Sequence, residues 1–415
     1  MKSEFIECSI GDIVQLKQGL AINAKTKHLL KEKGLPLLRI TDLLNNSHEQ
    51  YVDEEKAPKQ CIVNYGDLIY TRTGQVGYIF NNRKGVVHNN CFTIEPTVKD
   101  LTKDFIYWYF KQTKIQKYAE NIASGSVQKD LNHSAFNSIP FKYPICINTQ
   151  KKIAHILSTL DNKIELNRKM NQTLEAMAQA LFKSWFVDFD PVKAKVNCSS
   201  DEELETVAKE LGISKEILEL FPSEFEDSEL GMIPKGWSVD VLDSFVEILD
   251  SKRVPLSKME REKRKGNIPY YGATSIMDYV DDYLFDEPLT LMGEDGSVSR
   301  DNGTPFMQYI WNKAWINNHA HVLKGKNLLS TEAIYILLLK QNITQFITGA
   351  VQPKINQGNL KRIPVINPNN NLYEKYSEFI IPIFAQIRTS SEEIQTLQKT
   401  RDTLLPKLLN GEIEV

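Results

Sequence analysis

Cysteine is scarce in this chain, and long apolar runs are absent from it. The 415 residues include five cysteines, and none of them forms a C-x-x-C pair. The spacings typical of a zinc site or a disulfide framework are therefore missing. The longest apolar cluster, Ala333 to Leu339, is much shorter than the roughly 18 apolar residues of a membrane span. The opening MKSEFIECSI has no apolar signal region, so we expect a cytoplasmic protein with no membrane role.

Recognisable catalytic motifs are also missing. The chain has no G-x-G-x-x-G, no phosphate-binding G-x-x-x-x-G-K-[ST], no H-E-x-x-H and no G-x-S-x-G. His319 and His321 alternate in a predicted strand and so share a face, but no third metal ligand lies at a useful spacing. We interpret them as surface or interface residues and expect no metal and no catalytic residue in this chain.

Asp188 and Asp190 are the nearest approach to a carboxylate pair. They lie between Phe186, Phe189 and Pro191 at the end of a predicted helix, where capping or helix termination explains them. A metal-dependent DNA nuclease built on this pair remains one alternative for the function. A protein-binding scaffold without any role on DNA is another.

The net charge of −3 conceals an uneven distribution. Residues 201–229 hold eleven acidic and two basic residues, a local net of −9, so the remainder carries −3 − (−9) = +6. The densest basic run spans residues 251–266, and a second lies between Lys25 and Lys33. Basic clusters are the usual electrostatic signature of phosphate binding, although a solvated loop explains either run equally well.

The chain contains an internal repeat. Residues 125–140, GSVQKDLNHSAFNSIP, align without gaps with residues 349–364, GAVQPKINQGNLKRIP, and six of the sixteen positions are identical. Other segments pair in the same order along the two halves. They are 5–14 with 237–246, 35–43 with 268–276, 65–79 with 285–299, and 86–94 with 315–323. A duplicated chain predicts a molecule with approximate two-fold symmetry.

The paired segments predict two domains of mixed α and β structure, each of about 140 residues. The early segments are short, rich in β-branched and aromatic residues and separated by glycine turns, which favours strands. A helix is expected over 104–122 in one copy and 331–347 in the other. The Gly-x-Val-Gln segment follows in each copy, then a strand ending at proline.

Each copy closes with a long helix of coiled-coil character. Residues 150–187 contain no proline or glycine and would span about 57 Å as a helix. Both helices carry two apolar seams at heptad spacing, with eight of ten seam positions apolar in each. The first helix places Ile153, Leu160, Asn167, Leu174 and Leu181 in one seam, and Leu157, Ile164, Asn171, Ala178 and Trp185 in the other. The second places Tyr376, Ile383, Ser390, Leu397 and Leu404 in one, and Ile380, Ile387, Ile394, Arg401 and Leu408 in the other.

We expect these two helices to pair in antiparallel orientation within one chain, because neither seam can stay exposed. The most secure seam residues are Leu160, Ile164, Leu174, Leu181, Ile387, Ile394, Leu397 and Leu404. The polar members Asn167, Asn171 and Ser390 would fix the register. Packing of each helix on its own domain is the alternative. Pro382 and Pro406 should kink or break the second helix near its ends.

Three segments resemble the specificity subunits of type I restriction-modification systems. They are LFKSWFVDFDPVKAK at 181–195, SELGMIPKGW at 228–237 and LLPKLLNGEI at 404–413. The resemblance covers the whole chain and implies an α+β fold with two similar target recognition domains separated by an antiparallel two-helix coiled coil. It implies the following division: 1–149 first target recognition domain, 150–190 central conserved helix, 191–231 acidic connector, 232–370 second target recognition domain, and 371–415 C-terminal conserved helix.

The resemblance also implies a function. Such a subunit recognises a bipartite, asymmetric site on double-stranded DNA and is not itself an enzyme. Two modification subunits bind it and methylate adenine with S-adenosylmethionine, and up to two restriction subunits add cleavage that depends on ATP and Mg²⁺. Trp185 and Phe186 are candidates for the contact with a modification subunit, and core packing is the alternative.

Base-contacting residues differ between members of this family, so the candidates come from residue chemistry in predicted loops. Arginine and lysine suit guanine or phosphate, and asparagine and glutamine suit adenine. In the first domain the candidates are Lys25, Lys27, Arg72, Gln75, Asn89 and Lys129. In the second domain they are Lys252, Arg253, Arg264, Arg300, Asn317 and Lys354.

Overall fold

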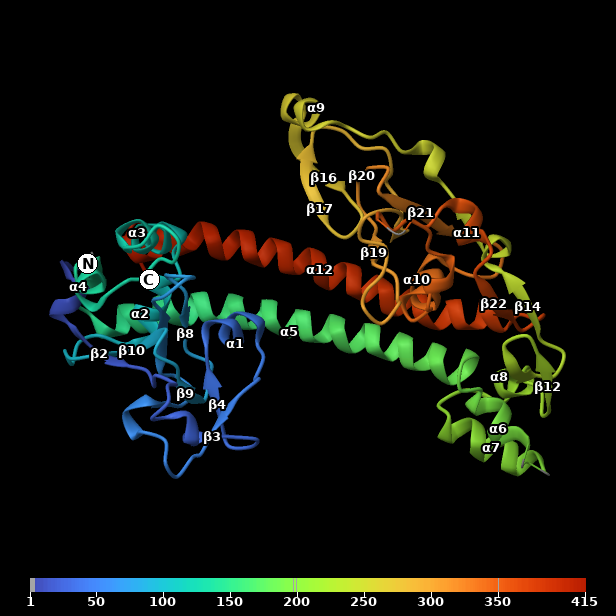
Figure 1. Ribbon diagram of the computed structural model, residues 1–415, viewed down its shortest axis with the longest axis horizontal. Helices are drawn as coiled ribbons and strands as arrows, with labels where there is room; N and C mark the ends of the chain where they lie inside the picture. Colours follow the sequence, from blue (N-terminus) through green and yellow to red (C-terminus); the bar gives the residue numbers. More distant parts are fainter. Residues whose placement is uncertain (1–3, 197, 199, 350) are drawn as a thin grey trace. The chain divides into compact units, whose positions relative to one another are not determined.

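The computed structural model describes residues 4–196, 198, 200–349 and 351–415, and it divides into two compact units (Figure 1). Unit 1 comprises Met1–Leu166 and Glu393–Val415, and unit 2 comprises Asn167–Glu392. The two long helices, α5 (Ile147–Phe186) and α12 (Leu372–Asn410), each contribute a segment to both units. Among the described residues, no helix combines the length and the apolar character that crossing a membrane requires.

Unit 1 is built on a four-stranded antiparallel sheet in the order β2-β10-β7-β8. Unit 1 also contains a five-stranded sheet in the order β3-β5-β4-β9-β6 and a two-stranded sheet, β1-β11. The strands are β1 (Phe5–Ser9), β2 (Val14–Gln18), β3 (Leu30–Lys31), β4 (Leu35–Leu38), β5 (Tyr51–Val52), β6 (Ile62–Val63), β7 (Leu68–Thr71), β8 (Ile79–Phe80), β9 (Gly85–Val87), β10 (Cys91–Pro96) and β11 (Pro140–Pro144). The helices before α5 are α1 (Ile40–Asn45), α2 (Lys103–Phe110), α3 (Thr113–Ile122) and α4 (His133–Asn137).

Unit 2 repeats the main sheet in the order β15-β21-β18-β19, accompanied by the sheets β14-β22, β17-β16-β20 and β12-β13. Its strands are β12 (Phe225–Ser228), β13 (Gly231–Pro234), β14 (Ser238–Val241), β15 (Val246–Ile248), β16 (Lys265–Tyr271), β17 (Ile276–Val280), β18 (Leu289–Gly293), β19 (Met307–Ile310), β20 (Trp315–Ile316), β21 (Ala320–Gly325) and β22 (Pro364–Asn367). Its helices besides the long pair are α6 (Asp190–Val196), α7 (Asp201–Glu210), α8 (Lys215–Glu219), α9 (Lys258–Lys263), α10 (Thr331–Leu339) and α11 (Gln357–Lys361).

The two units share one topology for the repeated part, as the duplication predicts. β2, β10, β7 and β8 occupy the same places as β15, β21, β18 and β19, and β1-β11 corresponds to β14-β22. A short 3-10 turn follows the first strand of each copy, at Ile10–Asp12 and Leu242–Ser244. The fold is therefore an internally repeated α+β structure.

Several local expectations are wrong in detail. The segment 104–122 forms two helices, α2 and α3, because Gln112 adopts an extended backbone and its side-chain amide donates to Tyr109 O at 3.1 Å. Within the segment 331–347, only α10 and a short 3-10 turn at Thr344–Phe346 are helical. The expected strand over 35–43 becomes β4 followed by α1.

The repeated prolines also differ from expectation. Pro140 and Pro364 begin β11 and β22, and the strands do not end there. The short helices α4 and α11 precede these strands. Proline is accommodated at the first position of an edge strand because it needs no backbone N–H donor there.

The acidic segment after α5 belongs to unit 2 and is folded there. It forms α7, α8 and the β12-β13 hairpin, and its Ala208, Leu218 and Phe221 are buried in the core of that unit. Its carboxylates lie on the exposed faces of these elements. The segment is thus a packed part of unit 2.

The long helices pair with each other inside both units. In unit 1, Asp161 of α5 bonds to Arg401 of α12, and Lys163 lies 3.6 Å from Glu393. In unit 2, Asn171 Nδ2 donates to Ser391 Oγ at 3.0 Å. Residues with higher numbers in α5 contact residues with lower numbers in α12. The paired segments of the two helices therefore run antiparallel.

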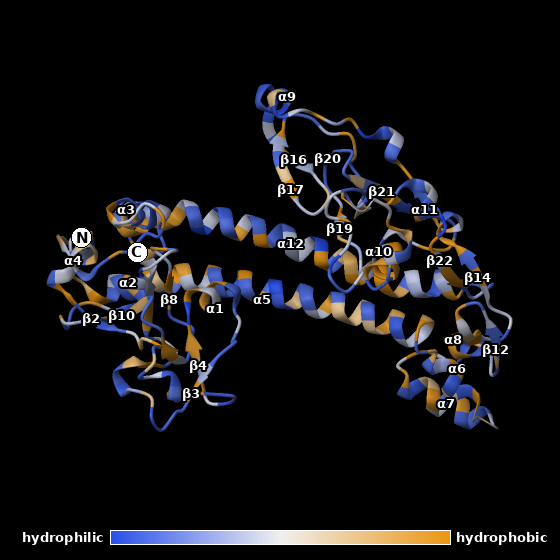
Figure 2. Ribbon diagram, viewed as in Figure 1, coloured by the Kyte–Doolittle hydropathy of each residue, from blue (hydrophilic) through white to orange (hydrophobic). Residues whose placement is uncertain are grey.

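Apolar and polar residues alternate along both helices, which Figure 2 shows as orange and blue stretches of α5 and α12. Every position of the four seams is buried or half-buried. Ile164 is fully buried, and the other named seam residues are half-buried: Leu160, Leu174, Leu181, Ile387, Ile394, Leu397 and Leu404.

We expected a kink or a break at Pro382 and Pro406, but helix α12 continues through both prolines, so a break is wrong. Each proline removes one backbone donor and crowds the preceding turn. Residues near both prolines pack into cores, including Ile380 and Phe384 around Pro382 and Leu405 and Leu408 around Pro406. Packing of an amphipathic face thus compensates for the missing hydrogen bonds.

Replacing Trp185 by alanine should lower the free energy of unfolding by about 3–5 kcal/mol, because the side chain is 1% exposed and leaves a cavity in unit 2. Met177→Ala, at a position 55% exposed on the same helix, should change it by less than about 0.5 kcal/mol. Urea unfolding followed by circular dichroism measures both. Equal losses in the two variants would contradict the buried placement of Trp185.

Candidate nucleic-acid interface

Most of the DNA-contact candidates predicted from the sequence lie in loops at one end of the strands of each main sheet. We call this end of the strands the sheet edge. In unit 1, β2 and β7 end where β10 begins, and Phe92 pairs with both Gln18 and Tyr70. In unit 2, β15 and β18 end where β21 begins. Three separate chain segments therefore meet at each edge, and residues distant in sequence become neighbours.

In unit 1 the centre of this edge is an ion pair. Arg72 donates two hydrogen bonds to the carboxylate of Asp130, both at 2.8 Å, and a third to Gln18 Oε1 at 3.2 Å. Thr73 Oγ1 also donates to Asp130 at 2.7 Å. Burial raises the pKa of Asp130, but the bonds from Arg72 and Thr73 outweigh it and hold that pKa below its ordinary value.

Other candidates of unit 1 surround this pair. Gly74 N, next to the exposed Gln75, donates to Lys129 O at 2.7 Å, and Gln18 Nε2 donates to Asn89 O at 2.7 Å. Gln75 and Lys129 have exposed side chains, and Asn89 is half-buried. Lys25 and Lys27 are exposed in the loop that follows β2. The structure thus brings Arg72, Gln75, Asn89 and Lys129 together from three segments.

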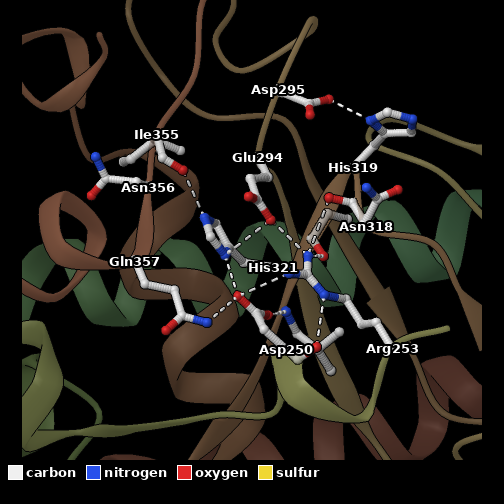
Figure 3. Close-up of polar contacts among 12 residues, drawn as sticks. Asp250, Arg253, Glu294, Asp295, Asn318, His319, His321, Ile355, Asn356 and Gln357 are labelled. Atoms are coloured by element: carbon white, nitrogen blue, oxygen red, sulfur yellow. Dashed lines mark hydrogen bonds and ion pairs between the residues drawn. The ribbon is translucent and has the colours of Figure 1, made fainter. Parts of the chain in front are cut away.

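The corresponding edge of unit 2 holds a buried polar network (Figure 3). His321 Nδ1 lies 2.6 Å from Asp250 Oδ2, and its Nε2 lies 2.8 Å from the carbonyl oxygen of Ile355. Arg253 bonds to Glu294 at 2.7 Å and to the carbonyl oxygen of Ala320 at 2.6 Å. Both ring nitrogens of His321 therefore face oxygen atoms of the protein.

Asp250 is the acceptor at the centre of this network. It also accepts from Val322 N at 2.8 Å and from Gln357 Nε2 at 2.7 Å. Burial raises the pKa of Asp250, but the bonds and charge of His321, with the donors Val322 and Gln357, keep it below its ordinary value. Asp250 is therefore a charged group built into the core of the edge.

His321 does not lie on the surface, so that expectation is wrong. It is fully buried, whereas the His319 side chain is 44% exposed and bonds to Asp295. The sequence spacing offered no further metal ligand for these histidines, but the tertiary structure brings two carboxylates to His321. Possible ligand atoms of Asp250, Glu294 and His321 lie within 4.8 Å of one another. Arg253 and Lys354, the latter 3.1 Å from Glu294, already pair with these carboxylates, so the cluster suits a charge network better than a cation.

The remaining candidates of unit 2 divide by exposure. Lys252, Arg300 and Lys354 are exposed, and Lys354 pairs with Glu294. Arg264 stacks on Trp315, 4.6 Å from the ring centroid, and bonds to Asp281 at 2.9 Å. Asn317 is only 4% exposed, and its Oδ1 accepts from His319 N. Arg253 and Asn317 are thus used inside the protein, contrary to their expected place in accessible loops.

Trp185 and Phe186 are also internal. Trp185 is 1% exposed and packs on Phe221 and Tyr376, with ring centroids 5.3 and 6.2 Å away. Phe186 is 3% exposed and packs on Tyr373. Rings so deeply buried offer no surface to another subunit, so the core-packing alternative describes them.

The carboxylate pair at the end of α5 has a structural role. Phe189 adopts a left-handed backbone, with φ of 56°, which ends the helical path after Phe186. Asp188 bonds to Lys183, and Asp190 begins α6. These contacts favour helix termination over the nuclease alternative.

Sequence analysis missed four residues of the edges, namely Gln18, Asp130, Asp250 and Glu294. One signal was available, because the repeat aligns Asp130 with Lys354 at the same offset as the shared glycines. The sheet pairing adds that Arg72 corresponds to Glu294. The ion pair is therefore reversed in sign between the units.

Replacing Asp250 by asparagine should lower the free energy of unfolding by about 2–3 kcal/mol near neutral pH, since three donors lose a charged acceptor. The pKa of Asp250 is lower in the folded chain than the usual 3.9 of an unfolded one. Its contribution is therefore present above about pH 4 and is lost as pH falls through the folded pKa. Urea unfolding at a series of pH values should show the difference from wild type shrinking on acidification.

Asp301→Asn, at an exposed loop position, is the matched control and should show no such pH-dependent difference. A D250N variant as stable as wild type at neutral pH would contradict the assigned network.

A family model described as the type I restriction modification DNA specificity domain matches the chain twice, over residues 2–176 and 234–399. The type I restriction enzyme MjaIX specificity subunit of Methanocaldococcus jannaschii is 27% identical over 380 residues, covering 87% of this chain and 81% of that protein. The HindI specificity subunit of Haemophilus influenzae is 26% identical over 469 residues, covering 99% and 100%.

Among solved structures, the S subunit of a type I restriction-modification system from M. genitalium is similar in fold. The TM-score is 0.60 at 16% sequence identity, and the match covers 98% of this chain and 96% of that one. The two segments matched by the family model make up well over half of the sequence, each containing one copy of the repeated sheet. This chain therefore belongs to the family of type I restriction-modification DNA specificity subunits.

Proposed function

We propose that the chain is the DNA sequence-recognition subunit of a type I restriction-modification complex. The observation that carries this proposal is the repeated sheet edge, which has the same topology in both units but different side chains. A common scaffold with divergent loops is what recognition of two different short sequences requires.

The two edges differ enough to prefer different base pairs. Arg72 and Gln75 belong to a loop that unit 2 replaces with Glu294 and Asp295. The exposed side chains at the two edges differ as well, since Gln75 of unit 1 suits adenine and Arg300 of unit 2 suits guanine or phosphate. The DNA site is accordingly bipartite and asymmetric, with one half read by residues 1–149 and the other by residues 232–370.

Exposure narrows the candidate contacts. The exposed side chains Lys25, Lys27, Gln75 and Lys129 serve the first domain, and Lys252 and Arg300 serve the second. Cations among them contact phosphate, and the amide of Gln75 suits adenine. Arg72, Asn89 and Arg264 are half-buried and position the loops through their intramolecular bonds, and the exposed Lys354 is held by its ion pair with Glu294.

The catalytic work belongs to partner subunits in this proposal. Two modification subunits methylate one adenine in each half-site with S-adenosylmethionine, and restriction subunits supply cleavage that depends on ATP and Mg²⁺. The chain itself selects the sequence for both activities and holds none of these cofactors.

Mapping methylated adenines in cells that express the chain with its modification subunit tests this function. The expected result is methylation at one sequence of two fixed blocks separated by a non-specific spacer. A single contiguous block, or cleavage of DNA by the purified chain with Mg²⁺ alone, would overturn the proposal.

The paired helices set the length of the spacer in this scheme. Adding one heptad to α5 and one to α12, around Asn171 and Ser390, lengthens the pair by about 10 Å, equivalent to about three base pairs. We expect the mapped spacer to lengthen accordingly and both half-sites to stay unchanged. Altered half-sites would show that the helices take part in recognition.

A face of α5 offers a docking surface for a modification subunit. Met170 and Met177 lie seven residues apart on one side of the helix and are 39% and 55% exposed. Methionine-rich exposed faces adapt well to a partner's apolar surface. This stripe replaces Trp185 and Phe186 as the proposed contact.

Met177→Glu should weaken binding of the modification subunit at least tenfold without changing the stability of the chain, because a charge would be buried in an apolar contact. Isothermal titration calorimetry measures the affinity. Met259→Glu, at a position 65% exposed on α9, is the control and should bind normally. Normal binding by M177E would place the contact elsewhere.

A further inference from the structure

The repeat places a fully exposed valine in a turn of each unit. Val127 is 100% exposed and Val351 is 99% exposed, and the repeat aligns them with each other. Burying a valine side chain stabilises a protein by about 1.5–3 kcal/mol relative to leaving it in water. Because Val127 and Val351 remain in water, neither turn gains this stabilisation from the valine at the corresponding position of the repeat.

The two turns have the same construction. In unit 1, Ser124 and Asp130 exchange backbone hydrogen bonds of 3.0 and 2.7 Å. In unit 2, Thr348 and Lys354 exchange two of 2.8 Å. The hydroxyl groups of Ser124 and Thr348 add bonds of 3.1 and 3.2 Å to the same carbonyl oxygens. Both loops are thus closed at the base in one way.

A glycine at the start of each turn makes this closure possible. Gly125 and Gly349 have φ of 97° and 89°, where side chains are disfavoured. A Cβ atom on either would lie 2.3 Å from the carbonyl oxygen of the glutamine three residues later, Gln128 or Gln352. The backbone at the base of each turn is therefore held in a compact arrangement, which lowers the entropy cost of binding there.

Each turn is also attached to the divergent loop beside it. Gly74 N donates to Lys129 O at 2.7 Å in unit 1, and Gly296 N donates to Pro353 O at 3.1 Å in unit 2. The ion pairs Arg72–Asp130 and Glu294–Lys354 make the same connection with opposite polarity. Loops that differ in sequence are thus bonded in the same way to the C-terminal side of the turn in both units.

We propose that these two turns, formed by residues 124–130 in unit 1 and by the described residues 348, 349 and 351–354 in unit 2, are sequence-independent DNA contacts, in which Val127 and Val351 pack against the sugars and base edges of a groove. This inference rests on the proposed function. DNA is favoured because each turn is bonded to the loop of its own unit on which half-site specificity depends, so a duplex that contacts the loop also reaches the turn. A contact kept alike in both units suits the geometry shared by all duplex DNA and cannot supply a preference that differs between half-sites.

The test uses the chain in complex with its modification subunit and the variants Val127→Ser, Val351→Ser and the double variant. Dissociation constants are measured by fluorescence anisotropy on a duplex containing the mapped site and on one lacking it. Each single variant should bind both duplexes about fivefold to tenfold more weakly, and the double variant should lose about the product. The methylated sequence should be unchanged. Val196→Ser, at a position 51% exposed on α6, is the matched control and should bind like wild type.

Three results would overturn the inference. Unchanged affinity in all variants would show that the tips do not touch DNA. A new methylated sequence would show that they read bases. Weaker binding of the modification subunit in the absence of DNA would assign the turns to that partner. Failure of the wild-type complex to prefer its mapped site would instead contradict the proposed function, so the two failures are distinguishable.

Discussion

Burial of the helix seams is the constraint on which each unit depends. Apolar surface left in water costs about 25 cal/mol per Å², so an exposed heptad stripe would be strongly destabilising. In unit 1, Ile153, Leu157 and Leu408 share a core with residues of the main sheet and of α2. In unit 2, Trp185 and Tyr376 do the same. Because helix and sheet share one core, the loops at the sheet edge project from a rigid base.

The repeat separates what is kept from what varies. Strand order, the 3-10 turn and the closed Gly-x-Val-Gln turn are kept in both units. The ion pair at the edge is reversed, from Arg72–Asp130 to Glu294–Lys354. Reversal preserves the attraction that fixes the loop while changing the sign of the charge on each side. A recognition module can thereby alter its chemistry without altering its fold.

Sequence patterns predicted the architecture well and the edge poorly. The heptad spacing of residues such as Leu157 and Ile164 identified both long helices, because periodicity reports directly on burial. The break expected at Pro382 and Pro406 does not occur, because the packing of α12 compensates for the local cost of proline inside a helix. Arg253 and Asn317 were expected in accessible loops, yet Arg253 bonds to Glu294 and Asn317 N donates to Tyr271 O, both partners lying far away in sequence. Exposure depends on such neighbours, which residue chemistry alone does not specify.

The amino-acid sequence by itself determined the duplication, the paired helices and the family, since these depend on spacing and on local motifs such as 181–195. Only the tertiary structure decided which residues meet at the sheet edges. Strand pairing brings Asp250 beside His321 across 71 positions, and Arg72 beside Asp130 across 58. A carboxylate becomes a buried anchor or a solvated charge according to those partners, and long-range pairing is the step that selects them.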